Sequence, residues 1–244
     1  TSPTSAGRAF RQARRPSHSP TSGAVWCRGP LEGQSEDVGP GRHGTRRLVR
    51  GLRVRADART GIQREYTREE PETKVAKKTL IKLAKHLAML PHTLNAHPKI
   101  ARLLKQREES VLKGGGINWA NAEALAFASL LTENVPVRLS GQDSRRGTFN
   151  QRHSTLVDQK TGQLYVPLAF LERGQAAIQI YDSMLSEAAV LGLEYGYSLE
   201  TPHGLTIWEA QFGDFANGAQ VIIDQFIGTS GTKWDRSSGL VMFL

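Results

Sequence analysis

The amino-acid sequence predicts an α/β fold in which helices cover both faces of a parallel sheet, and three observations predict it. From position 117 onward, segments with helical periodicity alternate with short apolar runs, as in α/β proteins. These runs are almost continuously apolar, which is typical of strands that are buried on both faces. Polar loops that contain glycine directly follow two of the runs, at the strand ends where open sheets of this class place ligands.

Two helices are predicted ahead of the sheet, in a helical linker over residues 65–116. Thr73 is the predicted N-cap of the first helix, and Pro91 ends it. Its apolar positions recur with a period near 3.6 residues and are Val75, Leu80, Leu83, Leu87 and Leu90. The second helix is predicted over His97–Arg107, with Pro98 in its first turn. Its inward-facing residues are predicted to be Ile100, Leu103 and Leu104, and a glycine loop at 114–116 follows.

The sheet domain is predicted over residues 117–244. Its first helix is capped by Asn118 and ends near Leu131. The predicted apolar stripe of this helix consists of Trp119, Ala122, Leu125, Ala126 and Leu130. Strands are predicted over Val135–Leu139, Ala177–Tyr181, Leu205–Trp208 and Gly239–Leu244, and further helices over Ser186–Tyr197 and Asn217–Phe226. Pro136 argues against a central position for the first strand, because proline donates no ladder hydrogen bond.

The first 64 residues differ in composition from the rest of the chain. Of the formal net charge of +9, residues 1–60 carry +8, from 12 Arg and no Lys against 4 acidic residues. This segment is rich in Gly, Ser and Pro and has no apolar periodicity, so we expect it to be disordered. Its Arg-only composition favours an inert or artefactual segment, and an arm that binds nucleic acid is the alternative. Because the chain ends inside its last predicted strand, we also expect the sheet domain to be truncated.

Several classes of protein are excluded. No apolar run reaches the roughly 18–20 residues of a transmembrane helix, and the chain begins without the apolar core of a signal peptide. The single cysteine, Cys27, excludes an internal disulfide framework and a cysteine-rich zinc site. The sequence also lacks a phosphate-binding loop, a dinucleotide-binding glycine motif, a paired-histidine zinc motif and the Gly-x-Ser-x-Gly motif of serine hydrolases.

Three polar groups follow predicted strands and are candidates for chemistry. The loop at 140–153 carries Asp143, two arginines at 145 and 146, and His153, which suits an anionic substrate or an ion-paired loop. Glu187 lies in the first turn of a helix, where it complements the helix dipole. The segment at 208–218 places Phe212 and Phe215 around a Gly-Asp pair, either in the core or as a platform for a flat ring.

Residues from about 74 to 244 closely resemble the first, decarboxylating component of the 2-oxoglutarate dehydrogenase complex. The segments that carry the resemblance are Val137–Asp143, Arg146–Phe149, Arg152-His153, Leu185–Glu187, Val190–Gly192, Glu194–Tyr197, Leu205–Phe215 and Asp224–Phe226. The resemblance implies the pyrimidine-binding domain of the transketolase type. It also implies a thiamine diphosphate enzyme of the tricarboxylic acid cycle that decarboxylates 2-oxoglutarate oxidatively and transfers a succinyl group to a lipoyl group.

The resemblance also assigns roles to individual residues. Glu187 is expected to bind a ring nitrogen of the aminopyrimidine and so to promote catalysis, and the cofactor-binding residues are expected to be Gln211, Phe212 and Phe215 together with Glu187. His153 is the candidate for polarising the substrate or stabilising its charge. Arg145 and Arg146 either line the approach to the site or form ion pairs. The family holds Mg²⁺ through a Gly-Asp-Gly motif, from which Gly213-Asp214-Phe215 departs, so we expect no metal ligands in this chain.

The implied partners are a second copy of the chain, a lipoyl-bearing succinyltransferase and dihydrolipoyl dehydrogenase. The implied location is the cytoplasm of a bacterium or the mitochondrial matrix of a eukaryote, and we expect this chain alone to be inactive. Two alternatives remain open. The first is a basic adaptor that binds nucleic acid through residues 1–60, and the second is a related enzyme that acts on a longer 2-oxo acid.

Overall fold

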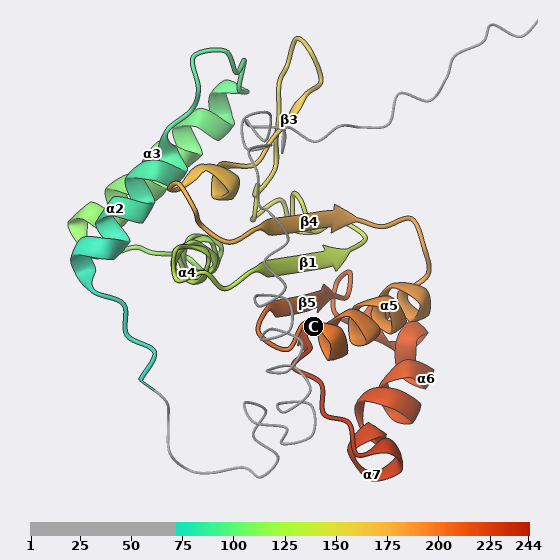
Figure 1. Ribbon diagram of the computed structural model, residues 1–244. Coiled ribbons are helices and arrows are strands. Elements are labelled where there is room, and N and C mark those ends of the chain that lie inside the picture. The colour runs from blue at the N-terminus through green and yellow to red at the C-terminus, as the bar shows by residue number, and fades with distance from the viewer. Residues whose placement is uncertain (1–71) are drawn as a thin grey trace, which may run out of the picture.

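The computed structural model describes residues 72–244 (Figure 1). A parallel sheet has the strand order β4-β1-β5-β6, with bounds Val137–Gly141 for β1, Ile178–Asp182 for β4, Leu205–Glu209 for β5 and Val241–Phe243 for β6. The main helices are α2 (Lys77–Ala88), α3 (Pro98–Lys113), α4 (Trp119–Thr132) and α5 (Glu187–Glu200). The predicted α/β fold is confirmed. Our expectations for residues 1–64, including the nucleic-acid arm, lie outside the described residues.

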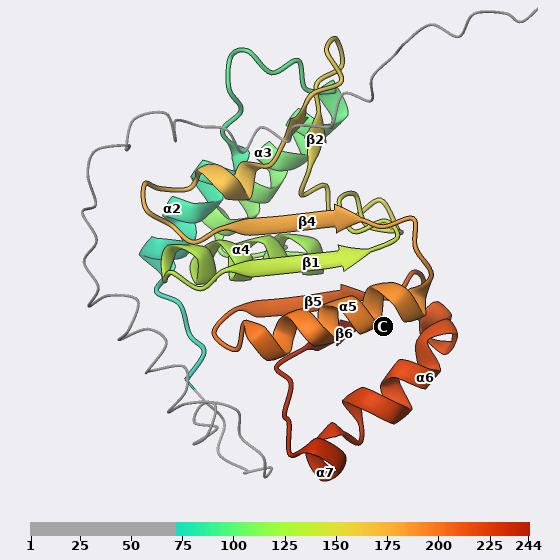
Figure 2. The ribbon, with the colours of Figure 1, turned by 45° about the vertical axis from the view of Figure 1, so that its right-hand side comes forward.

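The sheet separates two hydrophobic cores. On one face, Val137 and Leu139 of β1 pack with Leu83 of α2 and with buried residues of α4. On the other face, Leu191 of α5 packs against Trp208 of β5. Figure 2 shows α4 and α5 on opposite faces of the strands. Since fully burying one such side chain stabilises a fold by about 1.5–3 kcal/mol, both layers hold the sheet firmly.

The helices ahead of the sheet differ from the prediction at their ends. The Thr73 cap is wrong, because α2 begins at Lys77 and its N-cap, Ala76, has no side chain that can bond the helix. The start of α3 is as predicted, with His97 Nδ1 accepting a hydrogen bond from the backbone N–H of Lys99. This helix runs to Lys113 rather than ending at 107, because the first residue in the left-handed conformation is the glycine at 114.

The predicted apolar stripe of α4 is only partly confirmed, because Leu125 is buried and Leu130 packs against the core, whereas the other three predicted residues are exposed. The side chain of Trp119 is 92% exposed, and Ala122 and Ala126 are also exposed. The buried face consists of Ala120, Asn121, Leu125, Phe127, Ala128, Ser129 and Leu131. Because this helix is almost entirely apolar or small, its sequence pattern does not distinguish the inner face from the outer one. Its N-cap is as predicted, since Asn118 Oδ1 accepts from the N–H of Asn121 at 2.9 Å.

The first strand is central, contrary to the expectation from Pro136. β1 lies between β4 and β5 in the sheet. Pro136 precedes the first residue of β1, so its missing N–H costs no ladder bond, and its carbonyl accepts from Leu205 at 2.8 Å. The apolar runs therefore located the strands to within two residues and placed the starts of β1, β4 and β6 one or two residues too early.

Two segments carry structure that the sequence did not predict. The stretch between β1 and β4 forms an antiparallel pair, β2 (Leu156–Val157) with β3 (Leu164–Tyr165), and the 3-10 helix η1 (Pro167–Phe170). The single helix predicted at 217–226 is instead η2 (Asp214–Ala219), α6 (Gln220–Ile222) and the π-helical η3 (Ile223–Ile227), and α7 (Ser230–Trp234) follows. Within residues 72–244, no helix combines the length and apolar character that a membrane span requires.

Candidate functional site

The carboxyl ends of three neighbouring strands are level with one another. Gly141 at the end of β1 pairs with Asp182 of β4 and with Glu209 of β5. The loops that leave these strands therefore begin at one edge of the sheet, where open α/β sheets bind ligands. This edge is tightly packed, because a Cβ added to Gly141 would lie 2.5 Å from the carbonyl oxygen of Glu209.

Arg152 is a buried cation that ties the β1 loop to two other elements. Its guanidinium donates to both carboxylate oxygens of Glu123 on α4, at 2.5 and 3.0 Å, and to both of Glu209 on β5, at 2.6 and 2.7 Å. It also donates to the carbonyl of Ser144 at 3.0 Å. Burial alone would lower the pKa of Arg152, but the hydrogen bonds to the two carboxylates outweigh burial and raise it. Arg152 is therefore a structural anchor and is not free to bind a substrate.

The other arginines of this loop are also engaged. Arg146 forms an ion pair with Asp143 on the surface, and this pairing raises the pKa of Arg146. Arg145 donates through its backbone N–H to Asp182 at 2.9 Å and through Nε to the carbonyl of Ile180 at 3.3 Å. Of the two predicted roles for these residues, the geometry favours the ion-paired loop over an open anion site.

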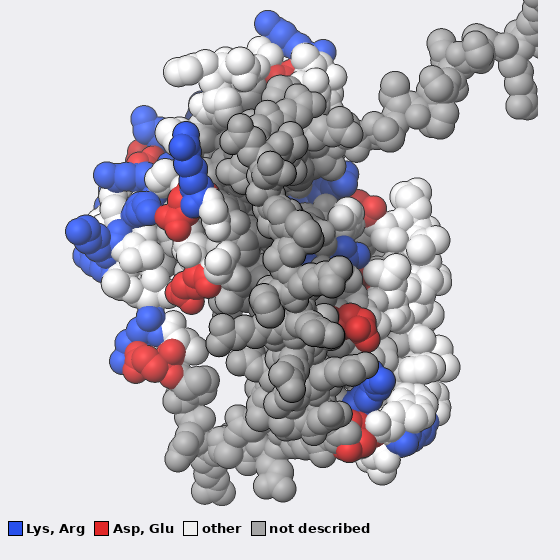
Figure 3. Space-filling model, in the orientation of Figure 1, with Lys and Arg blue, Asp and Glu red and all other residues white. Residues whose placement is uncertain are grey.

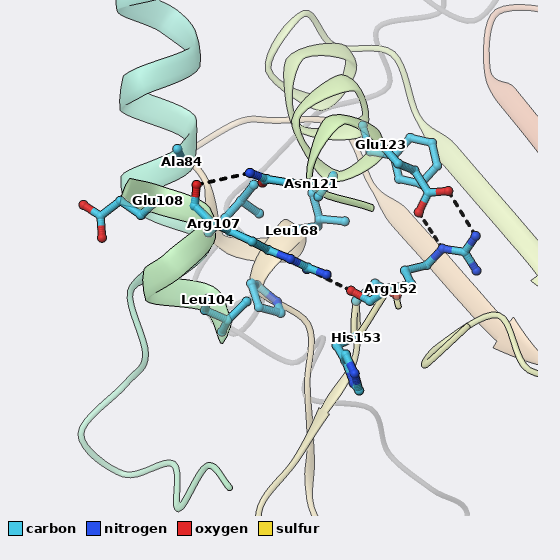
Figure 4. Close-up of a pocket in the computed structure, with 14 residues that line it drawn as sticks. Ala84, Leu104, Arg107, Glu108, Asn121, Glu123, Arg152, His153 and Leu168 are labelled. Carbon is cyan, nitrogen blue, oxygen red and sulfur yellow. Dashed lines mark hydrogen bonds and ion pairs between the residues drawn. The ribbon is translucent and has the colours of Figure 1, made fainter. Parts of the chain in front are cut away.

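His153 is held in an unusual backbone conformation. Its φ is 50°, in the left-handed region, and its ring Nε2 lies 3.0 Å from the carbonyl of Asn150. The half-buried ring lines a small cavity, partly open to solvent, between α2, α3, α4 and the loop (Figure 4). Burial lowers the pKa of the imidazole, and the charges of Arg107 and Arg146 lower it further, against the hydrogen bond to Asn150. The neutral form is therefore favoured.

Glu187 is the first residue of α5 and lies against η2. An added Cβ at Gly218 of η2 would be 3.2 Å from Oε2 of Glu187. Within the part of the chain that the structure describes, no group donates a hydrogen bond to this carboxylate and no cation pairs with it. The N-terminus of α5 favours a negative charge at this position. Glu187 thus presents an unengaged acid beside the aromatic segment.

Three phenylalanine rings form a row at the same edge of the sheet. The rings of Phe149 and Phe212 are 5.6 Å apart and nearly perpendicular, and the rings of Phe212 and Phe215 are 6.3 Å apart. Their side chains are 69%, 56% and 46% exposed in chain order, so they lie outside both cores. Of the two predicted possibilities, the structure supports the exposed platform. Exposed apolar groups of this kind mark binding surfaces.

At this edge, the sequence analysis assigned no role to Phe149, Met184 or Leu185, and it predicted Gln211 as a cofactor-binding residue. Phe149 was part of the recognised motif but had no assigned role, and its ring contact with Phe212 is visible only in three dimensions. Met184 and Leu185, in the loop after β4, are 99% and 60% exposed and extend the apolar surface. Gln211 is half-buried, and its side-chain amide forms no hydrogen bond with residues 72–244.

The predicted site residues fall into two groups. Glu187 lies against η2, the helix that also carries Phe215 of the platform, whereas His153 lines the cavity on the α4 side, to which Glu187 does not contribute. Within residues 72–244, no cluster of three or more His, Cys, Asp or Glu side chains could hold a metal ion.

Comparison with known proteins relates this geometry to a family. Residues 115–244 match the transketolase pyrimidine-binding domain. The chain is 54% identical over 173 residues to the 2-oxoglutarate dehydrogenase E1 component of Brucella anthropi, and the same identity and length hold for the E1 components of Brucella ovis and Brucella canis. Each match covers 71% of this chain and 17% of the relative.

The chain thus spans about 17% of the length of the curated relatives that it matches. The resemblance to this enzyme component, derived above from short segments, is confirmed by the extended identity. The matched region includes the whole sheet, the platform and Glu187, so it accounts for the elements that form the site. On these grounds the chain belongs to the transketolase pyrimidine-binding domain family.

Proposed function

We propose that residues 115–244 hold the aminopyrimidine ring of thiamine diphosphate in a 2-oxoglutarate dehydrogenase of the succinyl-transferring type. The observation that carries the proposal is the unengaged carboxylate of Glu187 beside an exposed aromatic platform. Apolar rings suit the face of a flat heterocycle, and an acid suits a ring nitrogen, so the residues present fit this cofactor. Membership of the pyrimidine-binding family and the identity to E1 components support the same assignment.

Each residue of this surface has a proposed role. The carboxyl group of Glu187 exchanges a hydrogen-bonded proton with a ring nitrogen of the pyrimidine. Phe212 and Phe215 contact the face of the ring and exclude water from it, and Phe149 supports Phe212 edge-on. Gln211, whose amide is unengaged, offers a donor and an acceptor to the ring substituents.

Thiamine diphosphate itself supplies the electron sink for decarboxylation of a 2-oxo acid. His153, whose lowered pKa favours the neutral imidazole, donates from Nε2 to the carbonyl of Asn150, so its Nδ1 presents a hydrogen-bond acceptor to a proton-bearing group of the substrate or to a bridging water, without adding a fixed charge. Residues 72–244 offer no cluster that would hold Mg²⁺, so we propose that its ligands come from another domain.

The proposed partners are those of the E1 family. They are a second copy of the chain, a lipoyl-bearing succinyltransferase and dihydrolipoyl dehydrogenase. The exposed apolar side chains around the platform and on α5, such as Met184 and Leu193, support burial of this side against another protein surface. The proposed location is the cytoplasm of a bacterium or the mitochondrial matrix of a eukaryote.

The proposal is tested by transplanting the domain. Residues 115–244 of this chain replace the matching segment in the Brucella anthropi E1 component, and decarboxylation is followed by reduction of ferricyanide. We expect the chimera to turn over 2-oxoglutarate with Mg²⁺ and thiamine diphosphate, and to prefer it to a 2-oxo acid one methylene longer. A folded chimera that binds the cofactor but prefers the longer acid would refute the substrate assignment. One that folds and binds no cofactor would refute the site.

The isolated chain provides a second test. We expect no steady reduction of ferricyanide when the 244-residue chain is mixed with thiamine diphosphate, Mg²⁺ and 2-oxoglutarate, because the proposed metal ligands lie elsewhere. Sustained turnover by the isolated chain would contradict this expectation.

A further inference from the structure

Arg107 is a buried arginine that lies outside the matched domain yet reaches the candidate site. It belongs to α3, ahead of residues 115–244, and only 9% of it is exposed. Figure 4 shows its side chain extending along the cavity from α3 toward the loop that carries Arg152 and His153. Asn121 of α4 fixes the backbone of Arg107, because Nδ2 of Asn121 donates to the backbone carbonyl of Arg107 at 3.1 Å.

The guanidinium of Arg107 binds two consecutive carbonyls directly before His153. Nη2 donates to the carbonyl of Gln151 at 2.5 Å, and Nη1 donates to the carbonyl of Arg152 at 3.0 Å. A forked cation that spans adjacent peptide groups fixes their orientation, in a way that a single-point donor such as lysine cannot.

These peptide groups need fixing because His153 has a left-handed backbone. For a residue other than glycine this conformation costs about 1–2 kcal/mol, and it persists only where the surroundings enforce it. Within the loop, the N–H of His153 donates to the carbonyl of Arg146 at 2.9 Å. Arg107, from another part of the chain, binds the carbonyl on the opposite side of the same Arg152–His153 peptide group.

The electrostatic setting of Arg107 indicates that its role is with this backbone. Among residues 72–244, no carboxylate lies within ion-pair distance of it, and burial lowers its pKa. Its Nε is buried without a hydrogen-bond partner in this part of the chain. A cation that is buried without an ion pair is costly, and the two carbonyls are its hydrogen-bond acceptors.

We infer that Arg107 is a positioning residue for His153, so that the helical segment ahead of the pyrimidine-binding domain sets the geometry of the candidate site. The inference rests on the proposed role of His153 in binding substrate. It also assigns a function to α3, which lies outside the family match and packs mainly against α2.

A consequence concerns the charge of His153. The charged groups that line its cavity are Arg107 and Glu108 from α3, Glu123 from α4 and Arg152 from the loop, and the charge of Arg146 also acts on the ring. Arg107 disfavours the imidazolium, so removing its charge raises the pKa of His153. Replacing it by lysine keeps the charge but loses the fork, which separates the effect of charge from that of geometry.

The test is an NMR titration of the full 244-residue chain with labelled histidine. The spectrum of His153→Asn identifies the signals of His153. In Arg107→Met we expect a higher titration midpoint for His153 and a large change in its amide shift. In Arg107→Lys we expect the amide change with a midpoint close to wild type. Arg102→Met, at an exposed arginine of the same helix, is the matched control and should change neither.

Both outcomes of the test are decisive. If the His153 amide shift is unchanged in Arg107→Lys, or in a folded Arg107→Met, the positioning role is wrong. In the E1 chimera, with the swap extended to residues 98–244, Arg107→Lys should raise KM for 2-oxoglutarate more than it lowers kcat. If the NMR changes occur without any effect on KM, Arg107 positions His153, and the proposed role of His153 in substrate binding is what fails.

Discussion

The two sides of the sheet meet at one edge but differ in how their polar groups are satisfied. On the α2–α4 side, Arg152 satisfies two carboxylates and His153 is fixed by hydrogen bonds to its backbone and ring. On the α5 side, Glu187 has no partner among residues 72–244, and phenylalanine rings face outward. The first side pairs its central arginine and His153 with groups of this chain, whereas the second has the composition of a surface that binds something else.

The surface shows the same contrast. In Figure 3, charged side chains gather over α2 and α3, whereas the edge formed by α5 and α6 is largely uncharged in this view. Leu193 on α5 and Val221 on α6 are each more than half exposed. The buried ion pairs therefore lie on one side of the sheet, and the exposed rings with the unpartnered Glu187 lie on the other, so substitutions on the two sides should differ in how far they affect stability and activity.

The largest effect is expected from Arg152→Met. The substitution leaves Glu123 and Glu209 partly buried and without their shared cation, which costs about 3–5 kcal/mol of unfolding free energy. Urea denaturation followed by circular dichroism measures it. Arg146→Met removes an exposed ion pair from the same loop and should leave the urea midpoint almost unchanged. Equal losses in the two variants would contradict the anchoring role of Arg152.

Glu187→Gln should reduce activity far more than it reduces stability. Loss of a proton-exchanging carboxyl group lowers kcat/KM by about 100-fold or more, which the ferricyanide assay of the E1 chimera measures. The urea midpoint should fall only slightly, because no group among residues 72–244 bonds this carboxylate and the favourable charge at the N-terminus of α5 contributes only about 0.3–1 kcal/mol. Near-normal turnover would remove Glu187 from the proposed mechanism.

Asp158 predicts a pH dependence on the α2–α4 side. The backbone N–H groups of Asn95, Thr161 and Lys160, each at 2.8 Å, hold the pKa of this carboxyl far below its usual range. A lowered folded-state pKa stabilises the fold above the unfolded-state value of about 3.9, and this stability is lost as the pH falls below that value. Asp158→Asn should therefore be less stable than wild type near neutral pH.

The difference in stability between Asp158→Asn and the wild-type chain should shrink as the pH falls. Urea midpoints of both proteins, measured at several pH values, test this. Asp214→Asn, at an exposed carboxylate of η2, is the control and should follow the wild-type curve. A constant difference at all pH values would assign the effect of Asp158→Asn to packing instead.

The smallest effect is expected from Phe149→Ala. The edge-on contact with Phe212 contributes about 0.5 kcal/mol, because both rings are largely exposed. Thiamine diphosphate binding to the E1 chimera, measured by calorimetry, should weaken by more than the stability falls. A loss of several kcal/mol in stability would place this ring in a core and contradict the platform.

The elements that depend on local sequence patterns, namely the strands and some helix ends, were predictable from the sequence. The apolar runs identified every strand of the parallel sheet to within two residues, and the cap at Asn118 and the proline at 98 marked two helix starts. Local patterns failed where a helix is apolar all round, as at Trp119, and where tertiary contacts extend it, as beyond Arg107.

The site was less predictable because its contacts are distant in sequence. Arg152 binds carboxylates 29 and 57 residues away, so no motif could have distinguished an anchor from a substrate-binding arginine. The exposure of the phenylalanine rings was left open by the residues alone, and the role of Glu187 came only from resemblance. The charge pattern gave no indication of Arg107, because its acceptors are backbone carbonyls.

The tight packing at Gly141 links the two sides mechanically. A methyl group there would collide with the end of β5 and with Oγ of Ser144, at 2.7 Å. Displacing β5 would shift Glu209, the carboxylate partner of Arg152, and also the turn that presents Phe212 three residues later. Because glycine has no side chain, position 141 therefore allows the close packing that keeps the Arg152 ion pair and the turn with Phe212 aligned with each other.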